Sequence, residues 1–246
     1  MLYLLLTALG VGGATVAGAL LGFLFPRGTH KYGDLILAFA SGVMLAASVF
    51  SLIIPSVEYA TSAHGPLGVS LTVLGIFAGA LTLTALDRIC PEETAPRVGK
   101  IPKEVALFVL AIAIHNLPEG LAAGVSFGGE SYRDTLMIAG SIALQNIPEG
   151  MVVIPPLLSS GTGRRRAFLI AAATGLVEII GTLLGYLFVE ISRGILPFAL
   201  AFAAGTMLYV IAGDMLPKTH TGAYRGRSTY AFLLGVALMV VFDALI

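Results

Sequence analysis

Long runs of hydrophobic residues, separated by short polar segments, dominate the pattern along this chain. A helix that crosses a bilayer needs about 20 mostly apolar residues. Runs of that length cover Met1–Phe25, Leu35–Val57, Pro66–Leu86, Val105–Gly129, Thr135–Gly163, Ala167–Val189, Gly194–Leu216 and Ser228–Ile246. The pattern therefore predicts an all-α polytopic membrane protein with eight transmembrane helices.

Composition supports this interpretation and excludes other classes. The chain is 57% hydrophobic and 11% charged, whereas a soluble domain carries about 25% charged residues. So few charges cannot cover a water-facing surface, and we expect a lipid bilayer around the chain. The 14 Lys and Arg balance the 14 Asp and Glu, so no basic face is expected to bind nucleic acid.

Basic residues on alternate loops predict the orientation. The loops after the first, third, fifth and seventh predicted helices contain 12 of the 14 Lys and Arg, namely Arg27, Lys31, Arg88, Arg97, Lys100, Lys103, Arg164, Arg165, Arg166, Lys218, Arg225 and Arg227. Because cytoplasmic loops are enriched in Lys and Arg, we expect both termini to lie outside the cytoplasm. We expect the protein itself to lie in the cell (inner or plasma) membrane. Residues 1–246 then form one transmembrane domain, in which residues 87–104 are a cytoplasmic loop.

Two internal similarities organise the chain. Ile112–Gly120 (IAIHNLPEG) matches Ile142–Gly150 (IALQNIPEG) at an offset of 30 residues, and Ala38–Leu45 (AFASGVML) matches Ala201–Leu208 (AFAAGTML) at an offset of 163. The second offset relates predicted helices 1–3 to helices 6–8, whose directions across the membrane are opposite. The sequence therefore predicts an inverted repeat around a central pair, helices 4 and 5, which is typical of secondary transporters.

The central pair carries ionisable and polar residues at mid-membrane. His115 and Glu119 lie four residues apart on predicted helix 4, and Gln145 and Glu149 repeat that spacing on helix 5. Four residues place two side chains on one helix face. Ionisable groups at membrane depth are costly and usually mark a functional pathway. A packing or proton-relay role remains the alternative for any single one of them.

Each motif also contains an asparagine and a proline. Asn116 and Asn146 lie next to the helix faces described above, and Pro118 and Pro148 cannot donate to the carbonyls four residues earlier. Imidazole nitrogen, carboxylate oxygen and amide oxygen together suit a borderline divalent cation such as Zn²⁺. Because no thiolate is present to trap the ion, the set indicates a transit site rather than a structural one.

Two further acids complete the candidate residues. Glu178, in predicted helix 6, has Thr174 on the same face and is expected to be a metal ligand. Asp214 lies near the cytoplasmic end of predicted helix 7. It is either a ligand in a vestibule or an interface residue.

Two other functions remain open on these residues. The first is a proton-coupled carrier of a small organic substrate, in which Glu119 and Glu149 carry protons. The second is an intramembrane hydrolase, although the chain has four histidines and only His115 lies at mid-membrane. No nucleophile is suggested beside His115.

The motifs HNLPEG (115–120), QNIPEG (145–150) and TGLVEIIG (174–181) resemble the ZIP family of divalent metal transporters across the whole chain. The resemblance implies a homodimeric carrier that moves Zn²⁺, often with other divalent cations, into the cytoplasm by an elevator-like motion. Helices 1, 4, 5 and 6 would form the moving domain. The metal would be the transported substrate, with no prosthetic group and no enzymatic activity.

The resemblance also implies a binuclear site. One metal position would use His115, Glu119, Gln145 and Glu149, and the other would use Asn116, Asn146 and Glu178 while sharing Glu119 and Glu149 as bridges. Many family members have His where this chain has Gln145, although a bacterial GufA-like branch also has Gln. Helix 2 often carries an acid where this chain has Ser51, the repeat mate of Asp214, and we expect both residues in a vestibule. The cytoplasmic loop lacks the histidine cluster that is common in relatives.

Overall fold

The computed structural model describes residues 1–24, 30–89, 101–128, 132–219 and 225–245. Most of the predicted loop 87–104 lies outside these ranges. The α-helices are α1 (Leu2–Gly22), α2 (His30–Ala47), α3 (Ile54–His64), α4 (Gly68–Ile89), α5 (Lys103–Val125), α6 (Tyr132–Ser159), α7 (Arg164–Leu187), α8 (Val189–Val210), α9 (Leu216–Thr219) and α10 (Arg225–Leu245). Two 3₁₀ turns cover Gly65–Leu67 and Ser126–Gly128, and two π-helical segments cover Ser48–Ile53 and Ile211–Met215. The described ranges contain no strand, so the predicted all-α class is confirmed.

Six helical stretches among the described residues are long and apolar enough to cross a membrane: Leu2–Gly22, Asp34–Ile89, Lys103–Val125, Arg164–Leu187, Gly194–Thr219 and Gly226–Leu245. The chain is therefore a multi-pass membrane protein. Asp34–Ile89 is 56 residues long and contains two of the eight predicted spans, which are separated by a turn at Gly65 with a positive φ of 60°. Helix α6 is not among the six stretches, so the number eight stays a prediction.

The helix ends differ from the predicted ones by a few residues. Arg164, Arg165 and Arg166 were predicted in a loop, but they form the first turn of α7. Lys103 likewise opens α5. Positive charges are unfavourable at a helix N-terminus, so the helix dipole does not explain their position. Charged side chains that reach the polar edge of a bilayer do explain it.

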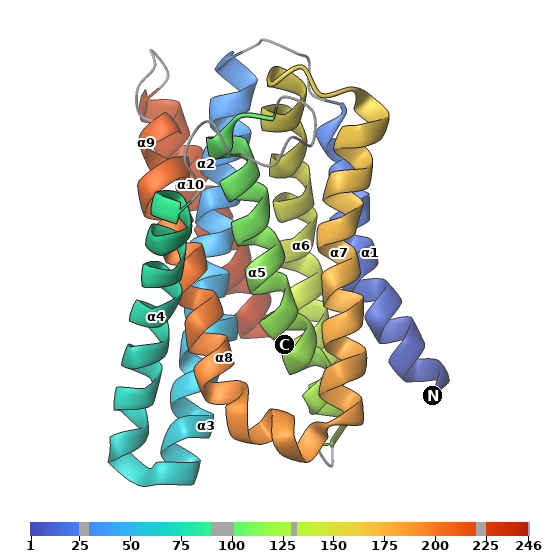
Figure 1. The fold of residues 1–246 in the computed structure, drawn as a ribbon, viewed down its shortest axis with the longest axis vertical. Helices are drawn as coiled ribbons and strands as arrows, with labels where there is room; N and C mark the ends of the chain where they lie inside the picture. The colour runs from blue at the N-terminus through green and yellow to red at the C-terminus, as the bar shows by residue number, and fades with distance from the viewer. Residues whose placement is uncertain (25–29, 90–100, 129–131, 220–224, 246) are drawn as a thin grey trace.

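The helices pack as two groups. Helices α1, α5, α6 and α7 form the first group, through the pairs α5 with α7, α1 with α6 and α1 with α7. The second group consists of α2 with α10 and of α4 with α8, joined through α3. In Figure 1, α1 rises from the end marked N, while α7 descends beside it. The two groups meet where α5 lies against α8 and α6 lies against α2.

Glycines allow very close approach inside each group. A Cβ atom added to Gly12 of α1 would lie 2.3 Å from the carbonyl oxygen of Gly175 on α7, and one added to Gly175 would lie 2.5 Å from that of Gly12. Contacts under 3 Å are also found at Gly18 and Gly22 (α1 on α6), Gly120 and Gly124 (α5 on α7), Gly42 (α2 on α10), and Gly75 and Gly79 (α4 on α8). Small residues of this kind let membrane helices pack backbone against backbone.

The two π-helical segments interrupt long helices at matching places. Ser48–Ile53 lies between α2 and α3, and Ile211–Met215 lies between α8 and α9. Their first residues are 163 positions apart, which is the longer repeat offset. Pro55 and Pro217 follow them, and neither proline can donate to the carbonyl four residues earlier. Each such carbonyl lies inside the π-helical segment.

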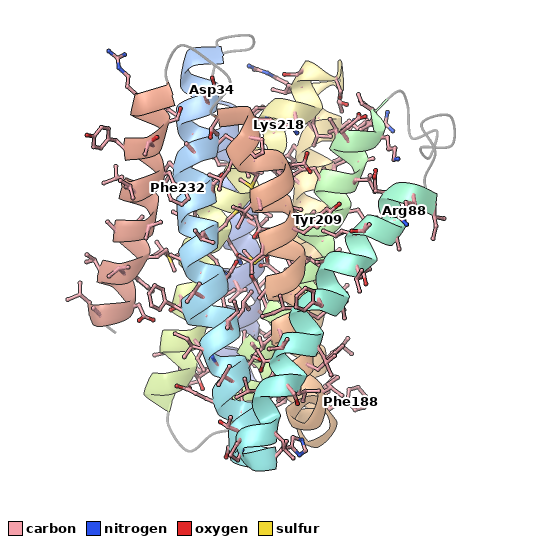
Figure 2. All side chains as sticks on the ribbon, turned by 90° about the vertical axis from the view of Figure 1, so that its left-hand side faces the viewer. Asp34, Arg88, Phe188, Tyr209, Lys218 and Phe232 are labelled. Carbon is pink, nitrogen blue, oxygen red and sulfur yellow. The ribbon has the colours of Figure 1, made fainter. Side chains whose placement is uncertain are left out.

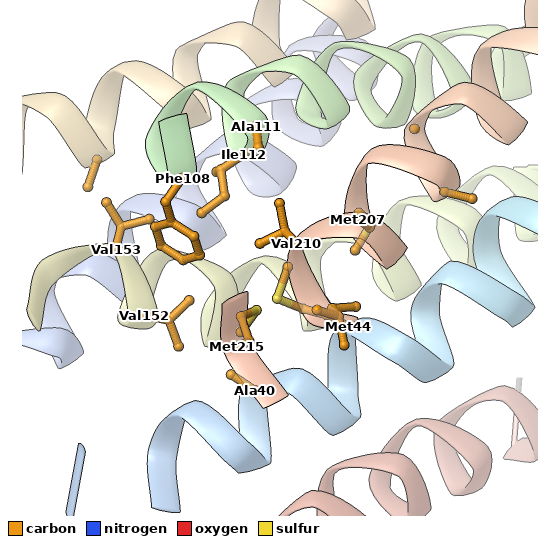
Figure 3. Close-up of a cluster of buried hydrophobic side chains, with 14 of the residues drawn as sticks. Ala40, Met44, Phe108, Ala111, Ile112, Val152, Val153, Met207, Val210 and Met215 are labelled. Atoms are coloured by element: carbon orange, nitrogen blue, oxygen red, sulfur yellow. The ribbon is translucent and has the colours of Figure 1, made fainter. Parts of the chain in front are cut away.

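An apolar cluster fills the space between the groups, next to the polar centre of the molecule. Figure 3 shows Phe108 and Ile112 of α5 facing Met44 of α2 and Met207 of α8. Phe108 lies two helical turns before His115 and on the same face of α5. The cluster therefore separates the polar centre from the end of the molecule where α5 begins.

That same end carries several charged residues. Figure 2 places Asp34, Arg88 and Lys218 toward one end of the helices and Phe188 toward the other. Lys103 forms an ion pair with Asp87, with Nζ 2.9 Å from Oδ1. This pair joins the last turn of α4 to the first turn of α5, across the ends of the segment that the structure does not describe.

Candidate metal centre

The seven predicted ligands lie on three neighbouring helices and are buried. They are His115, Asn116 and Glu119 on α5, Gln145, Asn146 and Glu149 on α6, and Glu178 on α7. His115 is 1% exposed, and the other six are 0% exposed. Burying so many polar groups is unfavourable unless they have partners. The contacts of each group therefore indicate what the centre can bind.

The structure brings four ionisable groups into electrostatic contact. Nε2 of His115 lies 3.2 Å from Oε2 of Glu149. Glu119 interacts with both of these side chains. Glu178 interacts with the carboxylates of Glu149 and Glu119. Three carboxylates and one imidazole are therefore near enough to interact electrostatically where α5, α6 and α7 come together.

Many donor and acceptor atoms of these residues have no hydrogen-bond partner among the described residues. The atoms are Nδ1 of His115, Oδ1 of Asn116, both carboxylate oxygens of Glu119, Oε1 and Nε2 of Gln145, Oδ1 of Asn146 and Oε1 of Glu149. An unpaired buried polar atom costs about 1–3 kcal/mol. All but one of these atoms, Nε2 of Gln145, can offer a lone pair to a cation.

Hydrogen bonds to neighbouring backbone hold the two asparagines. Nδ2 of Asn116 donates to the carbonyl oxygen of Thr174 on α7 at 3.2 Å. Nδ2 of Asn146 donates to that of Val11 on α1, also at 3.2 Å. Val11 and Thr174 are 163 positions apart, so the two bonds occupy equivalent places in the repeat. Both bonds use the amide nitrogen and leave Oδ1 as the free end of the amide.

The glycine at the end of each Pro-Glu-Gly motif is needed for close helix packing. A Cβ atom on Gly120 would lie 2.3 Å from the carbonyl oxygen of Glu178, and one on Gly150 would lie 2.0 Å from that of Thr15. Each Pro-Glu-Gly motif therefore lets a neighbouring helix approach its carboxylate closely. Any larger residue would separate α5 from α7 or α6 from α1.

Thr15 contacts this centre, although the sequence interpretation did not include it. Its Oγ1 donates to Oε1 of Glu178 at 3.1 Å, and the threonine is 0% exposed. Nδ2 of Asn146 donates to the other oxygen, Oε2, at 2.7 Å. Thr15 lies 163 residues before Glu178, so extension of the longer repeat to every polar position would have identified it.

The two predicted vestibule residues lie outside this centre, on separate cavities. Asp214 lines a cavity of about 220 Å³ together with Asp87, Glu104 and Phe108. It forms an exposed ion pair with Lys218 at 3.2 Å.

Ser51 lines a different cavity, of about 210 Å³, with Tyr59, Ser141 and Asp243. The first cavity reaches Ala111, one turn before His115. The second reaches Ile142, one turn before Gln145. Each cavity therefore ends about one helical turn from the buried centre, and neither Asp214 nor Ser51 reaches that centre in this conformation.

The described residues contain no group of three or more His, Cys, Asp and Glu side chains placed to hold a metal ion. A cation in the buried centre would therefore also need the amide oxygens of Asn116, Gln145 or Asn146, or closer carboxylates than this conformation has. Gln145 lies beside Glu119, and both side chains carry oxygens that could contact an ion in the centre.

Comparisons with known proteins agree with this geometry. The family model described as ZIP Zinc transporter matches residues 91–243. The zinc transporter ZIPB of Bordetella bronchiseptica is 36% identical over 241 residues, which cover 94% of this chain and 77% of that protein. The zinc transporter GufA of Myxococcus xanthus is 36% identical over 246 residues, covering 97% of each chain. The human zinc transporter ZIP11 is 31% identical over 319 residues, covering 94% and 93%.

Proposed function

Since the chain belongs to the family of ZIP zinc transporters, we propose that it carries Zn²⁺ and related divalent cations across the membrane into the cytoplasm. The observation that carries this proposal is the group of buried oxygen and nitrogen atoms between α5, α6 and α7 that have no hydrogen-bond partner and could bind a cation. Membership of a transporter family also means that the chain is not an enzyme. The metal is its substrate, and no prosthetic group is involved.

The donor set supports a site for two ions. In this proposal, His115 and Gln145 would bind one ion and Asn116, Asn146 and Glu178 the other, while Glu119 and Glu149 would be shared between the two. A pair of bridging carboxylates lets two dications lie close together because it offsets their mutual repulsion. Amide and carboxylate oxygens exchange readily, so the site suits an ion in transit.

The two kinds of helix contact support an elevator-like motion. Within each group, glycines let neighbouring helices pack so closely that an added Cβ atom would lie less than 3 Å from an atom of the next helix. Among the described glycines, none makes such a contact between α5 and α8 or between α6 and α2. Apolar side chains such as Phe108, Met44 and Met207 fill that boundary instead. We propose that α1, α5, α6 and α7 move as one body along it and carry the site.

Matched contacts support the predicted eight spans and inverted repeat. The hydrogen-bond acceptors Val11 and Thr174 and the two π-helical segments recur at the offset of 163 residues, and α1 and α7 run in opposite directions (Figure 1). We propose that α6 also crosses the membrane, because it packs against α1.

Arg88 and Lys218 lie toward one end of the helices (Figure 2), and α7, whose first residue is Arg164, begins at that end (Figure 1). This supports a cytoplasmic position for that end and an external position for both termini, in the cell membrane.

The resemblance to the family also supports a homodimer. The mass of the protein–detergent complex, measured by light scattering with the detergent contribution subtracted, tests this part of the proposal. A mass of one chain in every detergent would contradict it.

A proton-coupled carrier of organic molecules is the remaining rival. An organic substrate needs a cavity that reaches the site, yet the site side chains are almost fully buried. The hydrolase alternative does not agree with membership of a transporter family.

Metal uptake into proteoliposomes tests the proposed function. Native protein is reconstituted, and uptake of ⁶⁵Zn²⁺ is measured alone and with excess Fe²⁺, Mn²⁺, Cd²⁺ or Mg²⁺. We expect saturable zinc uptake that transition-metal ions inhibit and Mg²⁺ does not. Uptake no faster than in protein-free liposomes would contradict the proposal.

A further inference from the structure

Thr15 of α1 lies at the crossing of α1 and α7, where two carboxylate oxygens and one amide meet. Its hydroxyl group is fully buried and 3.1 Å from Oε1 of Glu178. A threonine in a helix usually returns its hydroxyl hydrogen bond to a carbonyl in the preceding turn. Here the Val11 carbonyl accepts from Asn146, and the hydroxyl of Thr15 donates across the helix interface to Glu178.

The backbone around Thr15 fixes its position. A Cβ atom on Gly175 would lie 3.1 Å from Cβ of Thr15, and one on Gly150 would lie 2.0 Å from the carbonyl oxygen of Thr15. The residue is therefore held between α7 on one side and α6 on the other. Close packing on both sides restricts the rotamers of Thr15, so its hydroxyl group has few other partners within reach.

Two hydrogen-bond donors hold the carboxylate of Glu178, one on each oxygen. Thr15 donates to Oε1, and Asn146 donates to Oε2. Asn146 also donates to Val11, so both of its N–H bonds are used and only Oδ1 is left to face a cation. The carboxylate of Glu178 is thus held in place by two donors from two different helices.

We propose that Thr15 is a positioning residue of the metal site, which fixes Glu178 and, through it, the orientation of Asn146. This inference rests on the proposed metal transport. Thr15 and Glu178 occupy equivalent positions in the repeat. The first repeat therefore supplies a hydroxyl group where the second supplies a carboxylate. A hydroxyl donor at position 15 stabilises the carboxylate at position 178, whereas a second carboxylate there would repel it.

Three variants of the full-length protein test the role of the hydroxyl. Thr15→Val keeps the shape but removes the donor, and Thr15→Ser keeps the donor but removes the methyl group. Thr7→Val makes the same chemical change two helical turns earlier on α1, at a half-buried position outside the site. Each is purified, checked for a single gel-filtration peak, titrated with Zn²⁺ by calorimetry, and assayed for zinc uptake in proteoliposomes.

We expect Thr15→Val to weaken zinc binding and to raise KM by roughly tenfold, as loss of a hydrogen bond to a charged group does, while kcat stays within about twofold. Thr15→Ser should recover most of that affinity, and Thr7→Val should match the native protein. If Thr15 were only a packing residue, Thr15→Ser would lose affinity because it lacks the methyl group, whereas Thr15→Val, which keeps the shape, would bind zinc as the native protein does. That result would overturn the proposal.

A double-mutant cycle distinguishes action through Glu178 from a direct effect. In a Glu178→Gln background, Thr15→Val should change zinc affinity by less than about twofold, because the carboxylate that it positions is gone. An undiminished tenfold effect there would contradict the inference. If valine does not yield folded protein, Thr15→Ala replaces it in both backgrounds. Native protein that binds no divalent cation would overturn the proposed function as well, whereas native binding with an unaffected Thr15→Val would overturn only the role of Thr15.

Discussion

The imidazole of His115 and the carboxylate of Glu149 face each other across the interface of α5 and α6, with Nε2 3.2 Å from Oε2. The contact uses one nitrogen of the histidine and one oxygen of the glutamate. In the part of the chain that the structure describes, the other two atoms, Nδ1 and Oε1, have no hydrogen-bond partner. A cation that enters the centre can therefore compete for both side chains, and so can a proton.

Competition with protons predicts that metal binding depends on pH. Imidazole and carboxylate bind a metal only when they are deprotonated, and histidine changes its charge in the physiological range. Apparent zinc affinity should weaken as the external pH falls from about 7.5 to about 5.5, and high zinc should restore uptake. His115→Ala should lower affinity at pH 7.5 and flatten part of this dependence. Proton release during zinc titration in weak buffer measures the competition, and equal affinity with no release at both pH values would contradict it.

Gln145 gives a prediction on selectivity. Its Oε1 and Nε2 have no partner, so the side chain is free to contact an ion. Gln145→His supplies an imidazole nitrogen, which binds zinc more strongly than an amide oxygen does. We expect tighter zinc binding in calorimetry and a slower maximal uptake rate, because release becomes harder. Unaltered affinity would show that position 145 does not contact the ion.

Two adjacent glycines on α1 predict opposite effects on stability. A Cβ atom on Gly12 would lie 2.3 Å from the Gly175 carbonyl oxygen, whereas one on Gly13 would meet no atom within 4 Å. Gly12→Ala should destabilise the protein by about 1–3 kcal/mol through overpacking. Gly13→Ala should be neutral or stabilise it by up to about 1 kcal/mol, the difference between Gly and Ala in a helix. Thermal unfolding in detergent compares them, and equal melting temperatures would contradict the close α1–α7 crossing.

The moving-body proposal predicts which cross-links stop transport. Leu107 of α5 and Gly213 of the segment after α8 line one cavity, so a thiol cross-link between Leu107→Cys and Gly213→Cys joins the two groups of helices. Leu110 of α5 and Ala173 of α7 line a groove within one group. With Cys90→Ser in both proteins, a bifunctional maleimide should stop zinc uptake in the first and spare it in the second. Uptake that survives full cross-linking of the first pair would exclude relative motion of the groups.

The sequence pointed to these candidate residues because ionisable residues are conspicuous in long apolar runs. His115, Glu119 and Glu149 lie within such runs, and the repeat at 30 residues relates Glu119 to Glu149. Glu178 was identified for the same reason. The structure adds the distances and the hydrogen bonds that hold these groups.

Other features could not be predicted in this way. Threonine is common in membrane helices, and the partner of Thr15 is 163 residues away, so local pattern gave no signal for it. The π-helical segments Ser48–Ile53 and Ile211–Met215 depend on hydrogen-bond register, which hydrophobic pattern does not reveal. The helix start at Arg164 was missed because polar residues were assigned to a loop, although they can extend a helix into the polar edge of the bilayer.

Zinc uptake by a Glu149→Gln variant tests the central claim most directly. Glu149 contacts His115 and interacts with Glu178, so the amide keeps the shape of the side chain and removes the charge on which both proposed ion positions depend. Asp34→Asn makes the same change on α2, at a carboxylate outside the buried centre. We expect Glu149→Gln to reach native expression and a single gel-filtration peak, with uptake near that of empty proteoliposomes, while Asp34→Asn transports as native protein does. Native uptake by folded Glu149→Gln would contradict the account.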